Sequence, residues 1–333
     1  MQQIPIAEEM IQGAVSFEVG DGWIKPWRLR FGERRLHHDS LVGIAETCAG
    51  VRLRFRTTSR VIRLDVAPEK TEGNRQFDLT IGGELIRTVE APPGGAQAAF
   101  EGLPAGEKTA EIWLPQVHGV RLRRLVVEEG HGVSAIPDQR PRWIAYGSSI
   151  THCGAAHSPA RTWPATAARR RDLNLTCLGY GGNCQLEPLV GMMIRDLPAN
   201  LISLKVGINV RGSLAERTFR TALIGMARII REKQPTTPIA VISPIVSPPH
   251  ESAPAWEGGL TLRRMREELE DAVARMRDYG DDNVHYFSGL DLLGEDLADR
   301  HLADGVHPDG DGYEIMGRNF AERIFPRVSL GDR

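Results

Sequence analysis

WIAYGSSIT, residues 143–151, joins an apolar segment to a small glycine-containing turn. A turn of this kind at the end of a buried strand is where a parallel α/β sheet can present a serine hydroxyl to solvent and substrate. Ser149 is therefore the candidate nucleophile. Gly-Ser-Ser is also ordinary loop composition, so this interpretation depends on what the rest of the chain supplies.

After residue 140 the sequence alternates apolar strands with helices. Largely apolar runs, typical of parallel strands covered on both faces, occupy residues 143–146, 175–180, 201–206, 239–242 and 284–287. Apolar residues also recur at helical spacing in three stripes that we interpret as core: Phe219, Leu223, Met226 and Ile230; Met265, Leu269, Ala272 and Met276; Tyr313, Met316, Phe320 and Ile324. Ser213 and Glu216 have the spacing of a capping box before the first stripe. The pattern predicts a doubly wound α/β domain with a parallel sheet.

Between about residue 14 and residue 128 the pattern is instead that of half-buried strands. Apolar residues alternate with charged or polar ones in runs such as 51–56 and 62–66, and helical periodicity is not evident. Roughly nine or ten short strands at this spacing predict an antiparallel β-sandwich of jelly-roll type. Glycine, proline and polar residues interrupt both patterns over 130–141. We therefore expect a β-sandwich accessory domain over 1–135 and a catalytic α/β domain over 136–333.

Three further motifs fall where loops leave the carboxyl ends of the predicted parallel strands. Gly181-Gly182-Asn183 follows the second strand, Gly207-Ile208-Asn209 follows the third, and Asp304-Gly305-Val306-His307 precedes the last helix. The ligand crevice of such a sheet lies beyond its carboxyl ends. The placement therefore predicts that these motifs meet Ser149 in one site.

The residue types suit acyl transfer. A serine hydroxyl is a weak nucleophile at neutral pH and needs a neighbouring base, which we assign to His307. Asp304, three residues earlier, can orient that base if the loop turns like a helix. The backbone N–H groups of Ser149 and Gly182 and the side-chain amide of Asn209 are the expected donors to the oxyanion.

Residues 142–326 resemble an SGNH (GDSL-like) hydrolase domain. Four blocks of that family contribute serine, glycine, asparagine and histidine, and the resemblance assigns these roles to Ser149, Gly182, Asn209 and His307, with Asp304 as the acid. The β-rich half resembles the N-terminal β-sandwich of multidomain members. One departure is Ser148, which stands where the family usually has aspartate. A serine hydroxyl there can hydrogen-bond the local backbone instead.

Three functions follow from this interpretation. The first is a serine esterase that hydrolyses a small carboxylic ester, such as an O-acylated sugar or glycoside, through an acyl-enzyme. The second is an acyltransferase that moves the acyl group to a sugar or natural-product alcohol; Arg211, Arg217 and Arg220 leave room for an anionic donor. The third is a catalytically inactive carbohydrate-binding protein, against which the intact set of site residues argues. The expected partner is thus a small-molecule or carbohydrate ester.

One loop after the fourth predicted strand is also of interest. It runs from Val246 to Gly259 and contains two adjacent prolines and Trp256. It is either a semi-rigid wall or lid of the site or an ordinary surface connection.

Composition limits the remaining possibilities. The chain has 333 residues with 41 basic and 43 acidic side chains, a balance that does not favour nucleic acid. Its apolar runs fall short of the roughly 20 residues needed to span a bilayer, and the first residues lack a signal-peptide pattern. We therefore expect a cytoplasmic protein without a membrane partner. The four cysteines lack CxxC spacing, so free thiols are expected. No metal or cofactor is expected, and the oligomeric state is open.

Overall fold

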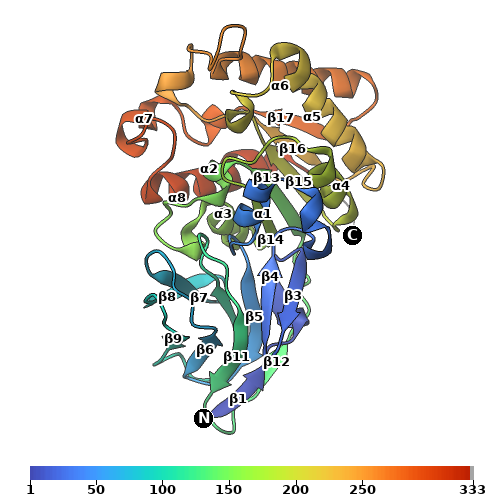
Figure 1. Ribbon diagram of the computed structural model, residues 1–333. Helices are drawn as coiled ribbons and strands as arrows, with labels where there is room; N and C mark the ends of the chain where they lie inside the picture. Colours follow the sequence, from blue (N-terminus) through green and yellow to red (C-terminus); the bar gives the residue numbers. More distant parts are fainter. Residues whose placement is uncertain (331–333) are drawn as a thin grey trace. The chain divides into compact units, whose positions relative to one another are not determined.

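The computed structural model describes residues 1–330 and divides the chain into two compact units (Figure 1). The first unit comprises Met1–Arg140 together with Ser158–Arg161, and the second comprises Pro141–His157 and the chain from Thr162 onward. The first is built from antiparallel strands and the second from a parallel sheet with helices. The predicted fold class is therefore confirmed.

Two antiparallel six-stranded sheets form the first unit. In one sheet the strands follow the order β3 (Ser16–Gly20), β4 (Trp23–Trp27), β11 (Leu122–Val127), β6 (Ile62–Val66) and β9 (Gln97–Phe100), with β1 (Gln2–Pro5) also paired to β11. In the other the order is β12 (Val133–Ala135), β5 (Arg52–Thr57), β10 (Lys108–Trp113), β7 (Arg75–Ile81) and β8 (Glu84–Ala91), with β2 (Ile11–Gln12) paired to β5.

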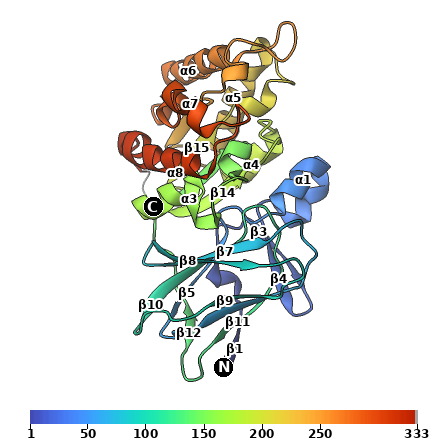
Figure 2. The same ribbon diagram turned by 90° about the vertical axis from the view of Figure 1, so that its left-hand side faces the viewer.

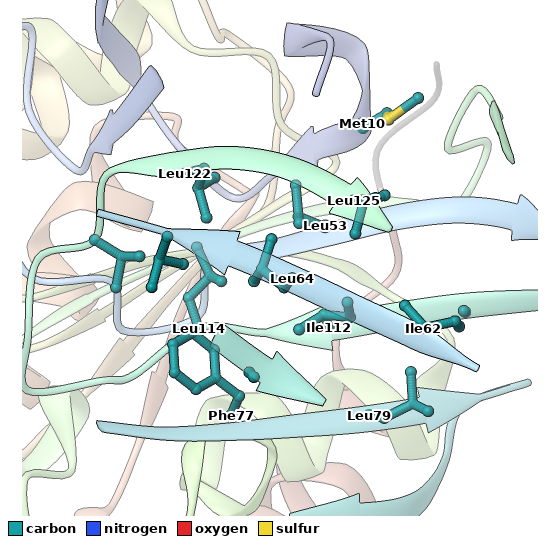
Figure 3. Packing of buried hydrophobic residues seen from close by; sticks show 14 of the residues in the cluster. Met10, Leu53, Ile62, Leu64, Phe77, Leu79, Ile112, Leu114, Leu122 and Leu125 are labelled. Atoms are coloured by element: carbon teal, nitrogen blue, oxygen red, sulfur yellow. The ribbon is translucent and has the colours of Figure 1, made fainter. Parts of the chain in front are cut away.

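The inner faces of these two sheets share one hydrophobic core. Ile62, Leu64 and Leu125 come from the first sheet, and Leu53 and Ile112 come from the second; Figure 3 shows their side chains gathered between the strands. All five are fully buried. The alternation visible in the sequence therefore corresponds to a sandwich, because every second side chain of a strand points to the same face.

This half also contains a helix, although its sequence shows no evident helical periodicity. A short helix, α1 (Asp39–Ala45), follows a 3-10 segment, Phe31–Leu36. The His38 ring accepts a hydrogen bond from the Ser40 N–H at the start of α1, and Leu41 and Ala45 are completely buried on one face. A two-turn helix offers only two such apolar positions, which is too few for the helical period to stand out from alternation.

A buried ionic cluster ties β5 and β10 to the segment that ends the first unit. Arg52 Nε lies 3.3 Å from Glu111 Oε1, and Arg140 Nη2 lies 2.5 Å from the same oxygen and 2.6 Å from Asp138 Oδ2. Burial opposes ionisation of Glu111, but the charges of Arg52 and Arg140 outweigh it and lower its pKa. Loss of one partner would leave uncompensated charge inside the unit.

The second unit contains a five-stranded parallel sheet at its centre. Its order is β14 (Asn174–Gly179), β13 (Arg142–Gly147), β15 (Leu201–Lys205), β16 (Ile239–Ile242) and β17 (Val284–Phe287). The chain thus starts on β13, moves to one side for β14 and returns to the other side for β15. The point at which the strand order reverses lies at β13, and in sheets of this kind ligands bind beyond the carboxyl ends of the strands at that point.

Helices cover both faces of this sheet. Helices α3 (Trp163–Arg171) and α8 (Gly310–Asn319) pack together, while α4 (Pro188–Asp196), α5 (Glu216–Arg231) and α6 (Leu262–Asp278) form a second group, as Figure 2 also shows. The short helices α2 (Ser149–His152) and α7 (Glu295–His301) complete the unit, and a π-helical turn, Phe320–Ile324, extends α8. All twelve residues of the three predicted stripes are buried, so these stripes are core. Within residues 1–330, no helix combines the length and apolar character that a membrane span requires.

The predicted capping box was wrong. Helix α5 has Ala215 as its N-cap residue, and the Thr218 hydroxyl accepts the Ala215 N–H at 3.1 Å. Ser213 lies two residues earlier, where its hydroxyl donates to Gln185 Oε1 at 3.0 Å. The spacing from Ser213 to Glu216 matched the motif, but the chain enters the helix two residues later.

Candidate active site

Ser149 is the first residue of α2, immediately beyond β13. Ser148 is the N-cap, and its buried hydroxyl accepts a hydrogen bond from the Ile150 N–H at 3.3 Å. The residue that replaces the family's usual aspartate therefore satisfies one of the free N–H groups at the start of the helix. Ser149 itself stays partly accessible, unlike Ser148 and Ile150 on either side.

Two glycines allow α2 to pack against the strand ends. A Cβ atom added to Gly147 would overlap the Thr151 side chain, and one added to Gly179, at the end of β14, would overlap the backbone of Thr151 and His152. Because backbone atoms cannot move aside as a flexible side chain can, Gly179 is the stricter requirement. Close approach of backbone to backbone is thus what fixes the position of the Ser149 turn.

Ser149, His307 and Asp304 form one chain of hydrogen bonds. Ser149 Oγ lies 2.8 Å from His307 Nε2, and His307 Nδ1 lies 2.7 Å from Asp304 Oδ2. A carboxylate accepts only, so Nδ1 carries the proton and Nε2 presents its lone pair to Ser149. The three side chains thus have the geometry of a nucleophile, a base and a group that orients the base.

The Asp304 carboxylate is held in its ionised form. Its Oδ1 accepts the N–H groups of Val306 at 2.8 Å and His307 at 2.7 Å, while Oδ2 faces the imidazole. The backbone N–H of His307, followed by its side chain, lowers the pKa of Asp304 from 3.8 to about 2. A turn of the backbone therefore fixes the Asp304 carboxylate as well as bringing it within reach of the His307 imidazole.

The loop that carries Asp304 and His307 is tied at its ends and at its middle. At the ends, His301 O accepts the Asp309 N–H at 2.9 Å, and His301 Nδ1 lies 3.0 Å from Asp309 Oδ1. In the middle, the Ser247 hydroxyl donates to Gly305 O at 2.6 Å. The acid–base loop is thereby anchored to the start of α8 and to the segment that follows β16.

Gly182 and Asn209 lie in the loops that follow the two strands flanking β13. Gly182 has a φ of +70°, a left-handed conformation that glycine adopts without strain. Asn209 lies in a 3-10 turn, Ile208–Val210, after β15. Asn209 Oδ1 accepts the Cys184 N–H at 3.1 Å. The NH₂ group is therefore the end of this amide that can act as a donor.

The segment 246–259 lies at the same carboxyl ends of the parallel strands. Its Ser247 end contacts the acid–base loop, while Arg211 Nη2 donates to Ala253 O at 3.2 Å and Ala215 forms an isolated antiparallel bridge with Gly259. It therefore connects the Asp304–His307 loop to the residues that follow Asn209. Trp256, near its centre, is 42% exposed.

The structure thus joins Ser149, Asp304 and His307 directly and places Gly182 and Asn209 beyond the strands on either side. Sequence reasoning missed the groups that hold these loops: the Cys184 N–H, the Ser247 hydroxyl, and His301 with Asp309. Each forms a bond that involves a backbone atom or that joins residues at a sequence separation typical of no known motif. No motif in the sequence could have indicated them.

A doubly wound sheet with a serine at its switch point and an Asp-x-x-His loop before the last helix defines the SGNH hydrolase class. A model of the GDSL-like lipase/acylhydrolase family matches residues 140–325, and a model of the N-terminal domain of SsfX3 matches residues 10–123. The chain belongs to the GDSL-like lipase/acylhydrolase family.

Solved structures agree with this assignment. The salicylyl-acyltransferase SsfX3 from a tetracycline biosynthetic pathway is 33% identical, with a TM-score of 0.89 over 98% of this chain and 97% of that one. A protein described as GDSL-like lipase from Bacteroides ovatus is 19% identical, with a TM-score of 0.79 and 99% of both chains covered. A family two carbohydrate esterase from Clostridium thermocellum is 13% identical, with a TM-score of 0.69 over 95% of this chain and 98% of that one. The last two show the fold alone. The curated proteins contain no significant match.

Proposed function

We propose that this protein is a serine enzyme that cleaves a small carboxylic ester through an acyl-enzyme on Ser149. The observation that supports this best is the hydrogen-bonded chain from Ser149 through His307 to Asp304, with links of 2.8 and 2.7 Å. The domain roles are part of the proposal: the α/β unit is catalytic, and the β-sandwich is accessory.

In the first half of the reaction, Ser149 Oγ attacks the ester carbonyl and its proton passes to His307 Nε2. The carbonyl oxygen becomes an oxyanion, to which the N–H groups of Ser149 and Gly182 and the Asn209 amide donate. Collapse breaks the bond to the leaving alcohol, which takes the proton from His307. Asp304 stays ionised throughout and stabilises the imidazolium.

In the second half, a water or an alcohol attacks the acyl carbon and gives its proton to His307, and Ser149 leaves with that proton. Hydrolysis is the first candidate because the base is accessible: the side chains of His307 and Asp304 are 43% and 56% exposed. Water can therefore reach His307. The proposed substrate is an O-acylated sugar or glycoside, by analogy with the carbohydrate esterases that share the fold.

Acyl transfer is the second candidate, and one observation favours it. The similarity to salicylyl-acyltransferase SsfX3 extends over both units at 33% identity. In this reaction an alcohol on a sugar or natural product takes the place of water. A catalytically inactive carbohydrate-binding protein is the third candidate, but it gives no reason for an oriented base beside Ser149. We also propose a cytoplasmic location, since four buried free thiols are typical of a reducing compartment.

A fluorophosphonate and a series of p-nitrophenyl esters test the proposal. Intact-mass measurement should show one adduct on the native protein and none on Ser149→Ala. Ser148→Ala is the matched control, because it removes the neighbouring hydroxyl and only a helix cap, and it should still be labelled. Labelling of Ser149→Ala at the native rate would refute the assigned nucleophile.

Hydrolysis and transfer are distinguished by how the acyl-enzyme divides between water and an added alcohol. The acyl-enzyme is formed from an activated ester, sugar or polyketide-type alcohols are added, and free acid and new ester are measured by mass spectrometry. Free acid as the main product supports hydrolysis. An acyl-enzyme that is stable in water but transfers rapidly to one alcohol would replace the esterase by the acyltransferase.

A further inference from the structure

Gln185 lies in the same loop as Gly182, and its side chain reaches the loop that contains Asn209. It belongs to the segment that links β14 to α4, three residues after Gly182. That segment is held in an unusual conformation, because the next residue, Leu186, has a φ of +58° although it is not glycine. The Leu186 N–H donates to the hydroxyl of the buried Tyr146 on β13 at 3.1 Å. The backbone around Gln185 is therefore anchored to the strand that leads to Ser149.

The Gln185 side chain makes three hydrogen bonds. Its Nε2 donates to Gly182 O at 3.2 Å and to Asn209 O at 3.0 Å, and its Oε1 accepts from the Ser213 hydroxyl at 3.0 Å. An amide nitrogen has two N–H groups, and both face carbonyl oxygens here. The reverse orientation of the amide would place oxygen against two carbonyl oxygens, so the orientation is determined by its partners.

The sheet topology explains why such a link is needed. Strands β14 and β15 are not neighbours, because β13 lies between them. Neighbouring strands are about 4.8 Å apart, so the loops that follow β14 and β15 begin about 10 Å from each other. Backbone pairing within the sheet cannot fix that separation beyond the strand ends. The Cys184 N–H to Asn209 Oδ1 bond supplies one connection, and the Gln185 side chain supplies two more, to Asn209 O and from the Ser213 hydroxyl. Its bond to Gly182 O fixes Gly182 within the same loop.

No other residue type of similar size reproduces this set of bonds. Glutamate would present a carboxylate to two carbonyl oxygens and would repel them. Asparagine is shorter by one methylene group, and lysine lacks an acceptor for the Ser213 hydroxyl. A neutral amide on a side chain of this length satisfies two acceptors and one donor together.

We propose that Gln185 is a positioning residue that holds Gly182 and Asn209 at the separation required to bind the oxyanion. The inference rests on the proposed function, because it concerns the same oxyanion hole. Gln185 does not touch the reacting atoms. It acts through the two donors, and their displacement by a fraction of an ångström weakens the transition state more than the bound ester.

The experiment compares Gln185→Ala and Gln185→Glu with the native enzyme in hydrolysis of a p-nitrophenyl ester and in phosphonylation of Ser149. We expect kcat and the phosphonylation rate to fall about 10- to 100-fold in both variants, with KM within about twofold. Because Gln185 acts partly through Asn209, the double variant with Asn209→Ala should lose less than the product of the two single losses. Losses that multiply fully, or a change confined to KM, would overturn the proposal.

Gln234→Ala is the matched control. Gln234 is a buried glutamine whose Nε2, like that of the partly buried Gln185, donates to backbone carbonyls, those of Ile194 at 2.8 Å and Leu197 at 2.7 Å. These groups precede β15 and β16, so they lie at the amino ends of the strands, away from the site. The control should lower the melting temperature without lowering kcat, whereas Gln185→Ala should lower kcat by far more than any loss of folded protein explains.

The outcomes also separate this inference from the proposed function. An active native enzyme with an unchanged kcat in Gln185→Ala overturns the positioning role alone. A native protein that neither turns over any activated ester nor reacts with the fluorophosphonate overturns both.

Discussion

Replacement of Asp304 by asparagine tests the proposed acid–base chain most directly. The change keeps the size of the side chain, and its remaining oxygen can still accept the N–H groups of Val306 and His307 that now bind Oδ1 at 2.8 and 2.7 Å. The loop should therefore keep its turn. What changes is the other end, where an NH₂ group replaces the oxygen that lies 2.7 Å from His307 Nδ1.

The consequence is a reversal of the imidazole tautomer. An amide N–H at position 304 donates to Nδ1, so the proton moves to Nε2, and His307 no longer offers a lone pair to Ser149. We expect kcat for an activated ester to fall about 10⁴-fold at neutral pH, equivalent to about 5.5 kcal/mol in the activation free energy. KM should change little, because the carboxylate lies behind the base.

Steady-state hydrolysis, with the melting temperature as a control for folding, measures this effect. A loss below about tenfold in a folded variant would refute the idea that Asp304 orients the base.

The same carboxylate gives a prediction about stability at low pH. Its folded-state pKa of about 2 lies below its ordinary value of 3.8, so the unfolded chain binds this proton more readily. The stabilisation is therefore complete above about pH 4 and is lost as the pH falls through 2. Asp304→Asn should remove this contribution from the acid limb of the unfolding curve. An acid limb identical to that of the native protein would contradict the assigned pKa.

Three further predictions concern other parts of the molecule. Asn209→Ala should lower kcat about 10²- to 10³-fold with little change in KM, as expected for one oxyanion donor; a pure KM effect would instead make it a substrate-binding residue. The double variant Ser149→Ala/His307→Ala should be barely slower than either single variant, because residues that act as a unit are not additive, and fully multiplicative losses would contradict a shared step. Glu111→Gln should lower the free energy of unfolding of the first unit by about 3–5 kcal/mol, measured with urea, since Arg52 and Arg140 would lose their shared partner; a cost below about 1 kcal/mol would mean that this cluster is not needed.

The spacing of apolar residues in the sequence was sufficient to predict the fold class. Strands β13 to β17 lie where apolar runs predicted them, because a strand covered on both faces must be apolar throughout. The three helical stripes are buried for the corresponding reason at a period of 3.6 residues. Local detail was not predicted correctly. Helix α1 has too few turns for its period to be recognised, and α5 begins two residues later than Ser213 suggested.

The sequence also determined which residue types were available at the strand ends and in what order. This order was sufficient to predict Ser149, Gly182, Asn209, Asp304 and His307 as site residues. Their roles stay predictions. Only the tertiary structure decided how they meet: β13 lies between β14 and β15, and this order, set by long-range pairing, puts Ser149 at the switch point. The links that hold the loops, such as that from Gln185 to the Asn209 carbonyl, join backbone atoms to side chains 24 residues away. Backbone acceptors are the same in every residue, so a sequence carries no mark of which of them a side chain will bind.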